Sequence, residues 1–216
     1  MDDPVDSLAE LEANVRDIER ANAWFGGSAP ILREVERTTA TSVLDVGCGS
    51  ADIPLALSRR AKRRHRSMRI VGLDRSDQML DIARSRVGAD ATISLVKGDG
   101  SELPFEDRAF DVVTCSLTLH HCDPPQARSL LREMRRVAQL RPVVCDLRRS
   151  RAAYAATWAY TRAFTRNRLT RHDGPLSVLR AYTPDEAVEL ARDAGWERPV
   201  VQREPWFRFT LTDADR

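Results

Sequence analysis

VLDVGCGSAD, at residues 43–52, is the stretch that decides the fold of this chain. A short apolar run ends in a glycine turn, and a segment with helical spacing follows at 53–63. Glycines at such a turn let the backbone bend tightly and approach a ligand closely. A strand that passes through a glycine turn into a helix is typical of an α/β fold with a parallel sheet.

Strand-like and helix-like segments alternate on both sides of this turn. Apolar strands separated by helices predict a parallel sheet with helices on both faces. The last two strands are joined only by Glu204-Pro205, which favours an antiparallel hairpin. We therefore expect a three-layer α/β/α sandwich with a mostly parallel seven-stranded sheet and an antiparallel final hairpin. The expected strands are 42–46, 69–73, 92–96, 110–116, 142–146, 196–203 and 206–212, and the expected helices are 7–25, 29–38, 53–63, 77–86, 125–138 and 183–195.

A single domain over residues 1–216 fits this pattern, because no internal repeat or low-complexity linker interrupts it. Within it we expect an N-terminal helical cap at 1–40 and a ligand-binding core at 41–146. A lid-like insertion at 147–182 and a C-terminal helix and hairpin at 183–216 complete the chain.

The composition is that of an ordinary globular protein, with 42% hydrophobic and 31% charged residues. No apolar run approaches the ~20 residues of a membrane-spanning helix, and the acidic start, Met1-Asp2-Asp3, does not resemble a signal peptide. We therefore expect a cytoplasmic protein with no membrane span. The four cysteines show no C-x-x-C spacing, so we expect reduced thiols and no metal site. A net charge of +2 indicates no particular partner.

Acidic residues follow several predicted strands. Asp52 stands where a dinucleotide-binding turn needs a small residue, and its carboxylate would repel a diphosphate. Together with Asp45 it suits a cationic ligand end, such as the ammonium and sulfonium of S-adenosylmethionine. Asp74 is placed to accept hydrogen bonds from ribose hydroxyls, and Asp99 from an adenine amino group. Any one of these acids alone is better explained as a helix cap or a solvated loop residue. Their shared place at strand ends, where open α/β sheets bind ligands, favours a site.

As a set, these motifs resemble the class I S-adenosylmethionine-dependent methyltransferases. VLDVGCGSAD at 43–52 is similar to the first motif of that family, and VGLD at 71–74 to its ribose-binding strand end. VKGDGSELPF at 96–105 is similar to its adenine-side loop, and FDVVTCSLTLHH at 110–121 to its fourth-strand motif. The resemblance covers roughly residues 40–146 and is specific as a set.

The resemblance implies a Rossmann-like fold, with S-adenosyl-L-methionine as cofactor and S-adenosyl-L-homocysteine as product. It implies that Asp45 and the glycine turn hold the methionine end and that Asp74 holds the ribose. Asp99 and Gly100 would hold the adenine. Ala51 departs from the family, because many members have glycine there, but the change is small for small. The residues expected to bind the cofactor are Asp45, Gly47, Cys48, Gly49, Asp52, Asp74, Arg75, Met79, Asp99, Gly100, Ser101 and Ser116.

Two histidines are candidates for a catalytic base toward the methyl acceptor. His121 follows the fourth strand, and a neutral imidazole there could take a proton from a phenol or an acidic carbon. The alternative is that one histidine of the pair caps the next helix while the other packs, and for His120 we favour packing. His172, beside Asp173, is the second candidate. Residues 120–123 cannot all point at one ion, so no metal is expected.

The stretch 147–171 contains arginines and aromatics and no acid. Tyr154 and Trp158, like Tyr160 and Phe164, are four residues apart and would pair along a helix. One interpretation is a helix that packs its aromatic side on the sheet. The other is a lid over an apolar acceptor, since insertions at this edge often determine substrate choice.

These observations favour methyl transfer to a small-molecule acceptor that is phenolic, quinone-like or polyketide-derived. The tail and the WFGG at 24–27 loosely resemble a bacterial methyltransferase subgroup associated with type III polyketide synthases. A nucleic-acid methyltransferase is the first competing interpretation, because of the basic run at 59–66. That run should lie at the opposite sheet edge, so we expect no nucleic-acid partner. A cofactor-binding protein without activity would keep the same glycine turn, and so would a dehydrogenase, although Asp52 argues against the latter. The sequence does not indicate the oligomeric state.

Overall fold

The structure is a computed structural model that describes residues 13, 15–17, 20, 27–165 and 167–214. The described residues of the helix predicted at 7–25 are helical, and the rest of that prediction lies outside them. The elements that follow are α2 (Ala29–Glu36), β1 (Ser42–Val46), α3 (Asp52–Arg63), β2 (Arg69–Asp74), α4 (Asp77–Val87), β3 (Ile93–Lys97), β4 (Phe110–Ser116), η1 (Leu119–His121), α5 (Pro124–Val137), β5 (Ala138–Leu147), α6 (Arg151–Phe164), α7 (Arg168–Arg180), α8 (Pro184–Asp193), β6 (Pro199–Glu204) and β7 (Arg208–Asp213).

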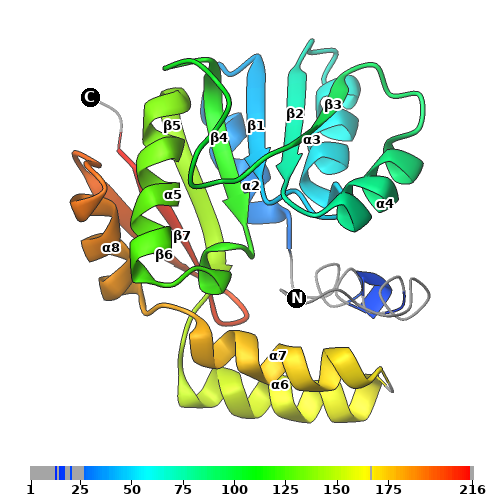
Figure 1. The fold of residues 1–216 in the computed structure, drawn as a ribbon, viewed down its shortest axis with the longest axis vertical. Coiled ribbons are helices and arrows are strands. Elements are labelled where there is room, and N and C mark those ends of the chain that lie inside the picture. Colours follow the sequence, from blue (N-terminus) through cyan, green and yellow to red (C-terminus); the bar gives the residue numbers. More distant parts are fainter. Residues whose placement is uncertain (1–12, 14, 18–19, 21–26, 166, 215–216) are drawn as a thin grey trace.

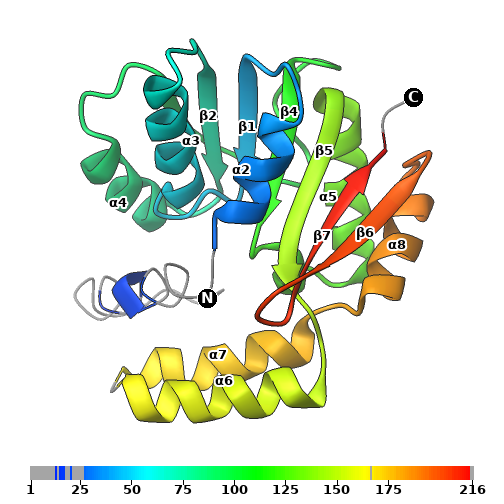
Figure 2. The ribbon, with the colours of Figure 1, turned by 180° about the vertical axis from the view of Figure 1, so that it is seen from behind.

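The seven strands form one sheet in the order β3-β2-β1-β4-β5-β7-β6 (Figure 1). Strands β1 to β5 pair in parallel, whereas β7 runs antiparallel to both β5 and β6. One apolar cluster packs α5 and α8 on one face of the sheet, and a second packs α2 and α3 on the other (Figure 2). The predicted Rossmann-like sandwich with a reversed final hairpin is therefore confirmed.

Strand β5 is longer than predicted. It begins at Ala138, directly after α5, whereas the sequence indicated a start at Pro142. Gln139 and Arg141 interrupt the apolar pattern, and the pairing with β4 shifts register between Phe110 and Val112. At the start of β5 the irregular pairing exposes Leu140 and buries Arg141, so burial there does not follow the order of apolar and polar residues.

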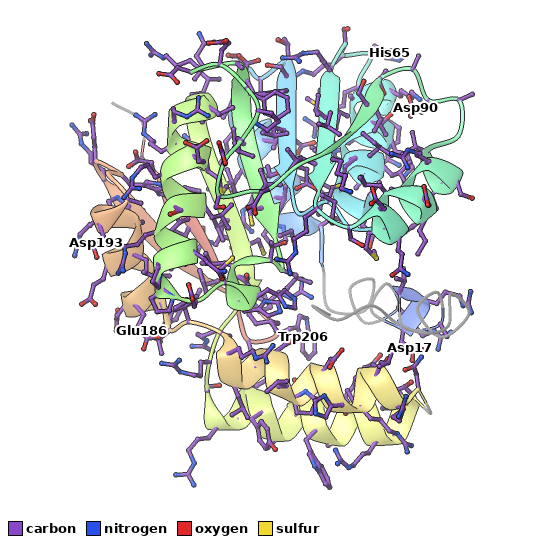
Figure 3. The ribbon with its side chains drawn as sticks, in the orientation of Figure 1. Asp17, His65, Asp90, Glu186, Asp193 and Trp206 are labelled. Carbon is purple, nitrogen blue, oxygen red and sulfur yellow. The ribbon has the colours of Figure 1, made fainter. Side chains whose placement is uncertain are left out.

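Helices α6 and α7 form a hairpin that lies across the edge of the sheet where β1, β4 and β5 end (Figures 1 and 2). Trp206, in the β6–β7 turn, lies on the side of the sheet that faces α7, whereas His65 and Asp90 lie at the opposite edge (Figure 3). The segment around His172 is thus part of a helix, and Pro175 lies inside it. Among the described residues, no helix is long and apolar enough to cross a membrane.

The aromatic side of α6 does not pack on the sheet, so that interpretation of residues 147–171 is wrong. Tyr154, Trp158 and Phe164 are 37%, 45% and 59% exposed. In α6 only Ala153 and Thr161 are buried. The helix spacing was predicted correctly, but spacing alone does not reveal which side of a helix meets the protein.

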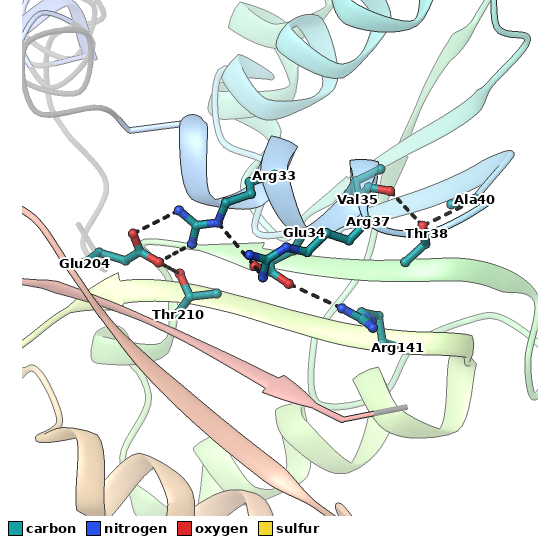
Figure 4. Close-up of polar contacts among 9 residues, drawn as sticks. All are labelled: Arg33, Glu34, Val35, Arg37, Thr38, Ala40, Arg141, Glu204 and Thr210. Carbon is teal, nitrogen blue, oxygen red and sulfur yellow. Dashed lines mark hydrogen bonds and ion pairs between the residues drawn. The ribbon is translucent and has the colours of Figure 1, made fainter. Parts of the chain in front are cut away.

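A cluster of ion pairs fixes α2 to the last strands of the sheet (Figure 4). The buried carboxylate of Glu34 lies 3.3 Å from Arg141 of β5. Arg33 pairs with Glu204 of β6, whose carboxylate also accepts a hydrogen bond from Thr210 at 2.9 Å. Because Glu34, Arg141 and Glu204 are buried and paired, removing a partner would leave a buried charge uncompensated.

Candidate functional site

The glycine turn after β1 is held by backbone hydrogen bonds to β2. The amides of Gly47 and Cys48 donate to the carbonyl of Leu73 at 2.8 and 3.0 Å. Three residues of the turn have positive φ, namely Gly47 at 71°, Gly49 at 50° and Ala51 at 65°. The turn therefore bends sharply into the N-terminus of α3, as the sequence predicts.

Gly47 also permits close contact with the loop after β4. A Cβ at this position would lie 2.7 Å from Cγ2 of Thr118, closer than two carbon atoms can approach. The Thr118 hydroxyl in turn donates to the carbonyl of Ser116 at 3.1 Å. The loops that follow β1 and β4 are thus packed against each other, and the sequence did not reveal this contact.

Asp45 is a buried carboxylate at the end of β1, only 1% exposed. The hydroxyl of Thr114 on β4 donates to its Oδ1 at 2.7 Å. Burial, together with the nearby charges of Asp74 and Asp52, raises the pKa of Asp45 to about 7, against the opposing effect of the Thr114 hydrogen bond. A cation at this place would favour the ionised form of Asp45.

The carboxylate of Asp74 joins two turns. Its Oδ2 accepts from the amide of Gly49 at 2.8 Å, and its Oδ1 accepts from the amide of Ser76 at 2.9 Å. Each carboxylate oxygen can accept a second hydrogen bond. Asp74 can therefore hold the glycine turn in place and still accept from a ligand hydroxyl.

Asp99 follows β3 and makes a local turn. Its Oδ1 accepts from the amide of Ser101 at 2.8 Å and from its hydroxyl at 2.7 Å. These hydrogen bonds, and more weakly the charge of Arg75, lower the pKa of Asp99 against partial burial. Gly100 packs tightly, because a Cβ there would lie 2.9 Å from Val46 and 3.0 Å from Leu130. Gly100 thus has a packing reason to be glycine in addition to its predicted binding role.

Three other predicted residues have structural partners. The carboxylate of Asp52 lies 2.9 Å from Arg86, which offsets the negative charge that we predicted for it. Cys48 is buried against Gly72, and burial raises the pKa of its thiol. Met79 is buried beside Val15, with its Cε next to Gly49. Met79 thus lies beside the turn, and its contact with the ligand stays a prediction.

A buried His–Asp pair lies at the ends of β4 and β5. Nδ1 of His120 is 2.6 Å from Oδ1 of Asp146, and both side chains are almost fully buried. Although burial opposes it, the interaction with His120 lowers the pKa of Asp146, with help from the amides of Leu147 and His120. His120 packs, as predicted, but its anchor Asp146 was not assigned a role, although it closes a strand as the other acids do.

The two predicted base candidates are both exposed. His121 is exposed, and its ring centroid is 4.2 Å from that of His120. His172 is 75% exposed on α7 and contacts Asp173 at 3.1 Å. Neither histidine of the pair at 120–121 caps α5, because Asp123 does so in a capping box.

Two features at this edge escaped the sequence analysis. Leu117, directly after β4, has φ of 53°, and Trp206 in the β6–β7 turn has φ of 59°. Such conformations are uncommon for large side chains and cluster at functional sites. Trp206 is 59% exposed. Backbone strain leaves no signature in single-residue composition, so the sequence could not have indicated it.

The acids at this edge fit a cationic nucleoside. Asp45 lies at the end of β1, Asp74 at the end of β2 and Asp99 after β3, and these three strands are neighbours in the sheet. The buried carboxylate of Asp45 suits an ammonium group, and the outer two suit donors from ribose and adenine. No group of His, Cys, Asp and Glu able to hold a metal occurs among the described residues.

Comparison with known proteins agrees with this geometry. Residues 43–141 match a family model described as a methyltransferase domain. The chain is 33% identical over 135 residues to a demethylmenaquinone methyltransferase of Staphylococcus aureus. That match covers 61% of the chain and 52% of the relative, so the chain spans about half the length of the curated relatives it matches.

Solved structures share the fold. A SAM-dependent methyltransferase from Aquifex aeolicus superposes with a TM-score of 0.57 at 20% identity, covering 80% of each chain. A structure titled "PigF with SAH" superposes with a TM-score of 0.61 at 16% identity, covering 86% of this chain and 55% of the other. The family match covers less than half of the chain, and the solved structures show that the fold is shared. Both agree with the predicted class I methyltransferase and with S-adenosylmethionine as its cofactor. The looser resemblance to a subgroup associated with polyketide synthases stays a prediction.

Proposed function

We propose that this chain, whose residues 43–141 match a methyltransferase domain, is a class I S-adenosylmethionine-dependent methyltransferase that methylates a small phenolic or quinone-like acceptor. The observation that carries the proposal is the buried carboxylate of Asp45 beside the sharp glycine turn, at the sheet edge where α/β folds bind ligands. When bound, S-adenosylmethionine supplies an activated methyl group for direct displacement by a nucleophile.

The residues of the chain position the cofactor from one side. Asp45 binds the ammonium of the methionine end, Asp74 accepts from the ribose, and Asp99 accepts from the adenine. The turn at 47–49 brings backbone close to the ligand, with Met79 packed beside it. Cys48, Asp52, Arg75, Gly100, Ser101 and Ser116 complete the proposed lining. Holding the reacting groups in this geometry is the main contribution, and base catalysis is a smaller one.

On the acceptor side, His121 is the base that we favour. Asp146 fixes the ring of His120, and the ring of His121 rests against that of His120. This support holds the exposed imidazole of His121 in place to take a proton from an acidic O–H or C–H group. His120 is then a positioning residue. His172 stays the second candidate, although its exposure gives it less support.

The acceptor class rests on two observations. The related protein of Staphylococcus aureus is named for action on demethylmenaquinone, which points to a quinone-like ring. The β6–β7 turn presents Trp206 on the side of α7, where an aromatic ring could stack (Figure 3). A polyketide-derived phenol fits the same chemistry.

The nucleic-acid interpretation finds less support in the basic run at 59–66. The run ends α3 and precedes β2, at the edge opposite the glycine turn. Arg60 pairs with Glu36, Arg64 lies 3.4 Å from Glu36, and Lys62 lies 2.7 Å from Asp90. These charges are engaged within the protein. We therefore propose no nucleic-acid partner, and a cytoplasmic location stays a prediction.

Labelled methyl transfer to a library of phenols and reduced quinones, read by mass spectrometry, tests the function. We expect one acceptor class to gain one methyl group. His121→Gln should lower turnover by about 100-fold with cofactor affinity unchanged, whereas the matched change His172→Gln should have a smaller effect. Cofactor binding without transfer to any member of the library would support a non-catalytic binding protein instead.

A further inference from the structure

Helix α6 carries a stripe of arginines and aromatics on its exposed side. Arg151, Tyr154, Trp158 and Arg162 follow at helical spacings of three and four, so they lie along one side. All four are exposed, and the guanidinium of Arg162 lies 4.1 Å from the ring centroid of Trp158. The aromatic rings are thus bracketed by cationic groups at both ends of the stripe.

The stripe continues onto α7. Leu179 is 53% exposed and lines the same hollow as Tyr154 and Arg151, with a volume of about 360 Å³. We call Arg151, Tyr154, Trp158, Arg162 and Leu179 the arginine–aromatic face. Two exposed alanines, Ala155 and Ala159, adjoin the stripe and widen its apolar part.

The charge of this region has one sign. No Asp or Glu occurs from residue 147 to 172, whereas arginine recurs throughout the stretch. Arg149 pairs with Glu186 of α8, but Arg151 and Arg162 lie on the exposed stripe itself. The face therefore combines a positive potential with exposed aromatic and aliphatic groups, and its partner must be complementary in both respects.

Of the possible partners, an anionic lipid surface matches best. Two copies meeting through a twofold axis would bring like charges together, which opposes self-association. A nucleic acid would engage the arginines but leave the alanines and Leu179 without a partner. We propose that the arginine–aromatic face docks on anionic membranes, with Trp158 and Tyr154 at the headgroup level and the arginines on lipid phosphates.

Docking through this face would place the site near the bilayer. The α6–α7 hairpin lies across the sheet edge that holds the glycine turn and the His120–Asp146 pair (Figures 1 and 2). An acceptor dissolved in the lipid would then reach the site from the hairpin side. The inference rests on the surface alone and holds for any acceptor, because vesicle binding needs no methyl transfer.

Co-sedimentation of the full chain with vesicles tests the proposal. We expect binding to phosphatidylglycerol and phosphatidylcholine in equal parts, little binding to phosphatidylcholine alone, and weakening by salt. Arg151→Glu with Arg162→Glu should weaken binding by about tenfold or more. Trp158→Ser should also weaken it. The matched control, Arg59→Glu with Arg63→Glu, makes the same charge change at the opposite sheet edge and should have a much smaller effect.

Cofactor affinity, measured for each variant, shows that the site is intact. No binding to the anionic vesicles would overturn the proposal, and so would equal losses in the two charge-reversal pairs. Retention on polyuridylate that depends on Arg151 and Arg162 but not on Trp158, without vesicle binding, would instead indicate a nucleic-acid surface.

Discussion

The loops that follow β1, β2 and β3 and the α6–α7 hairpin lie at the same edge of the sheet but are built differently. The loops are held by close contacts, such as Gly47 against Thr118 and Asp74 on the amide of Gly49. The hairpin buries little of α6 and exposes Trp158 and Phe164. The first region is fixed by its own contacts, whereas the second presents an open surface.

The match to the family model includes the first region and leaves out the hairpin. The methyltransferase model matches residues 43–141 and ends before α6 begins at Arg151. This is what chemistry predicts if the cofactor is common to the family and the acceptor is not. The hairpin is therefore where we expect acceptor choice and docking to be determined.

The largest expected effect concerns Asp45, at the end of β1, and the pH dependence of stability that it causes. The pKa of Asp45 is raised from 3.8 to about 7 in the folded protein. The folded state then holds a proton that the unfolded state releases, so the free energy of unfolding should fall as the pH rises from about 4 to 7, by roughly 4 kcal/mol from this group. In Asp45→Asn that loss should be absent.

Chemical denaturation at several pH values measures this difference. Asp81→Asn is the matched control, because Asp81 is an exposed acid on α4. If the free energy of unfolding depended on pH in the same way in the wild type and in Asp45→Asn, burial would not disfavour the ionised form of Asp45. The inference that this carboxylate needs a cationic ligand would then be wrong.

The next effect concerns cofactor binding. Asp45→Asn should weaken the affinity for S-adenosylmethionine by about 100-fold, since a buried charge pair loses one partner. Asp52→Asn should cost less, because Asp52 is a third exposed and already pairs with Arg86. Calorimetric titration compares the two. Equal losses would mean that the burial of Asp45 gives it no special role.

A smaller effect separates backbone strain from close packing. Gly47→Ala adds a positive-φ strain and an overlap with Thr118, whereas Gly195→Ala adds the strain alone, at φ of 88° in open space. We expect Gly195→Ala to cost about 1 kcal/mol of stability and Gly47→Ala roughly 2 kcal/mol more. Thermal unfolding would contradict the close packing of the two loops if both variants lost the same amount.

The smallest effect is expected in the hairpin. Trp158→Ala should lower the free energy of unfolding by about 1 kcal/mol or less, because it removes a half-exposed ring and one contact with Arg162. Leu131→Ala, in the fully buried core, should cost about 2–5 kcal/mol. A loss at Trp158 as large as that at Leu131 would show that α6 belongs to the core and is no docking surface.

The sequence was most informative where short-range patterns repeat. The strand, glycine turn and helix around residues 43–52 predicted the parallel sheet, and the link at Glu204-Pro205 predicted the reversed hairpin. The prediction from apolar spacing was wrong at the start of β5, where the strand includes the polar residues Gln139 and Arg141. It also gave no sign that Asp146 anchors His120, because the two residues are far apart in the chain and meet only through neighbouring strands.

By itself, then, the sequence determined the order of strands and helices and the acids at the strand ends, because apolar spacing and turn chemistry are local properties. Only the tertiary structure decided which groups meet. It paired Asp52 with Arg86, stacked His121 on His120 and turned the aromatic side of α6 to the surface. Those outcomes depend on how strands align and helices rotate against the sheet, and packing between distant segments fixes both.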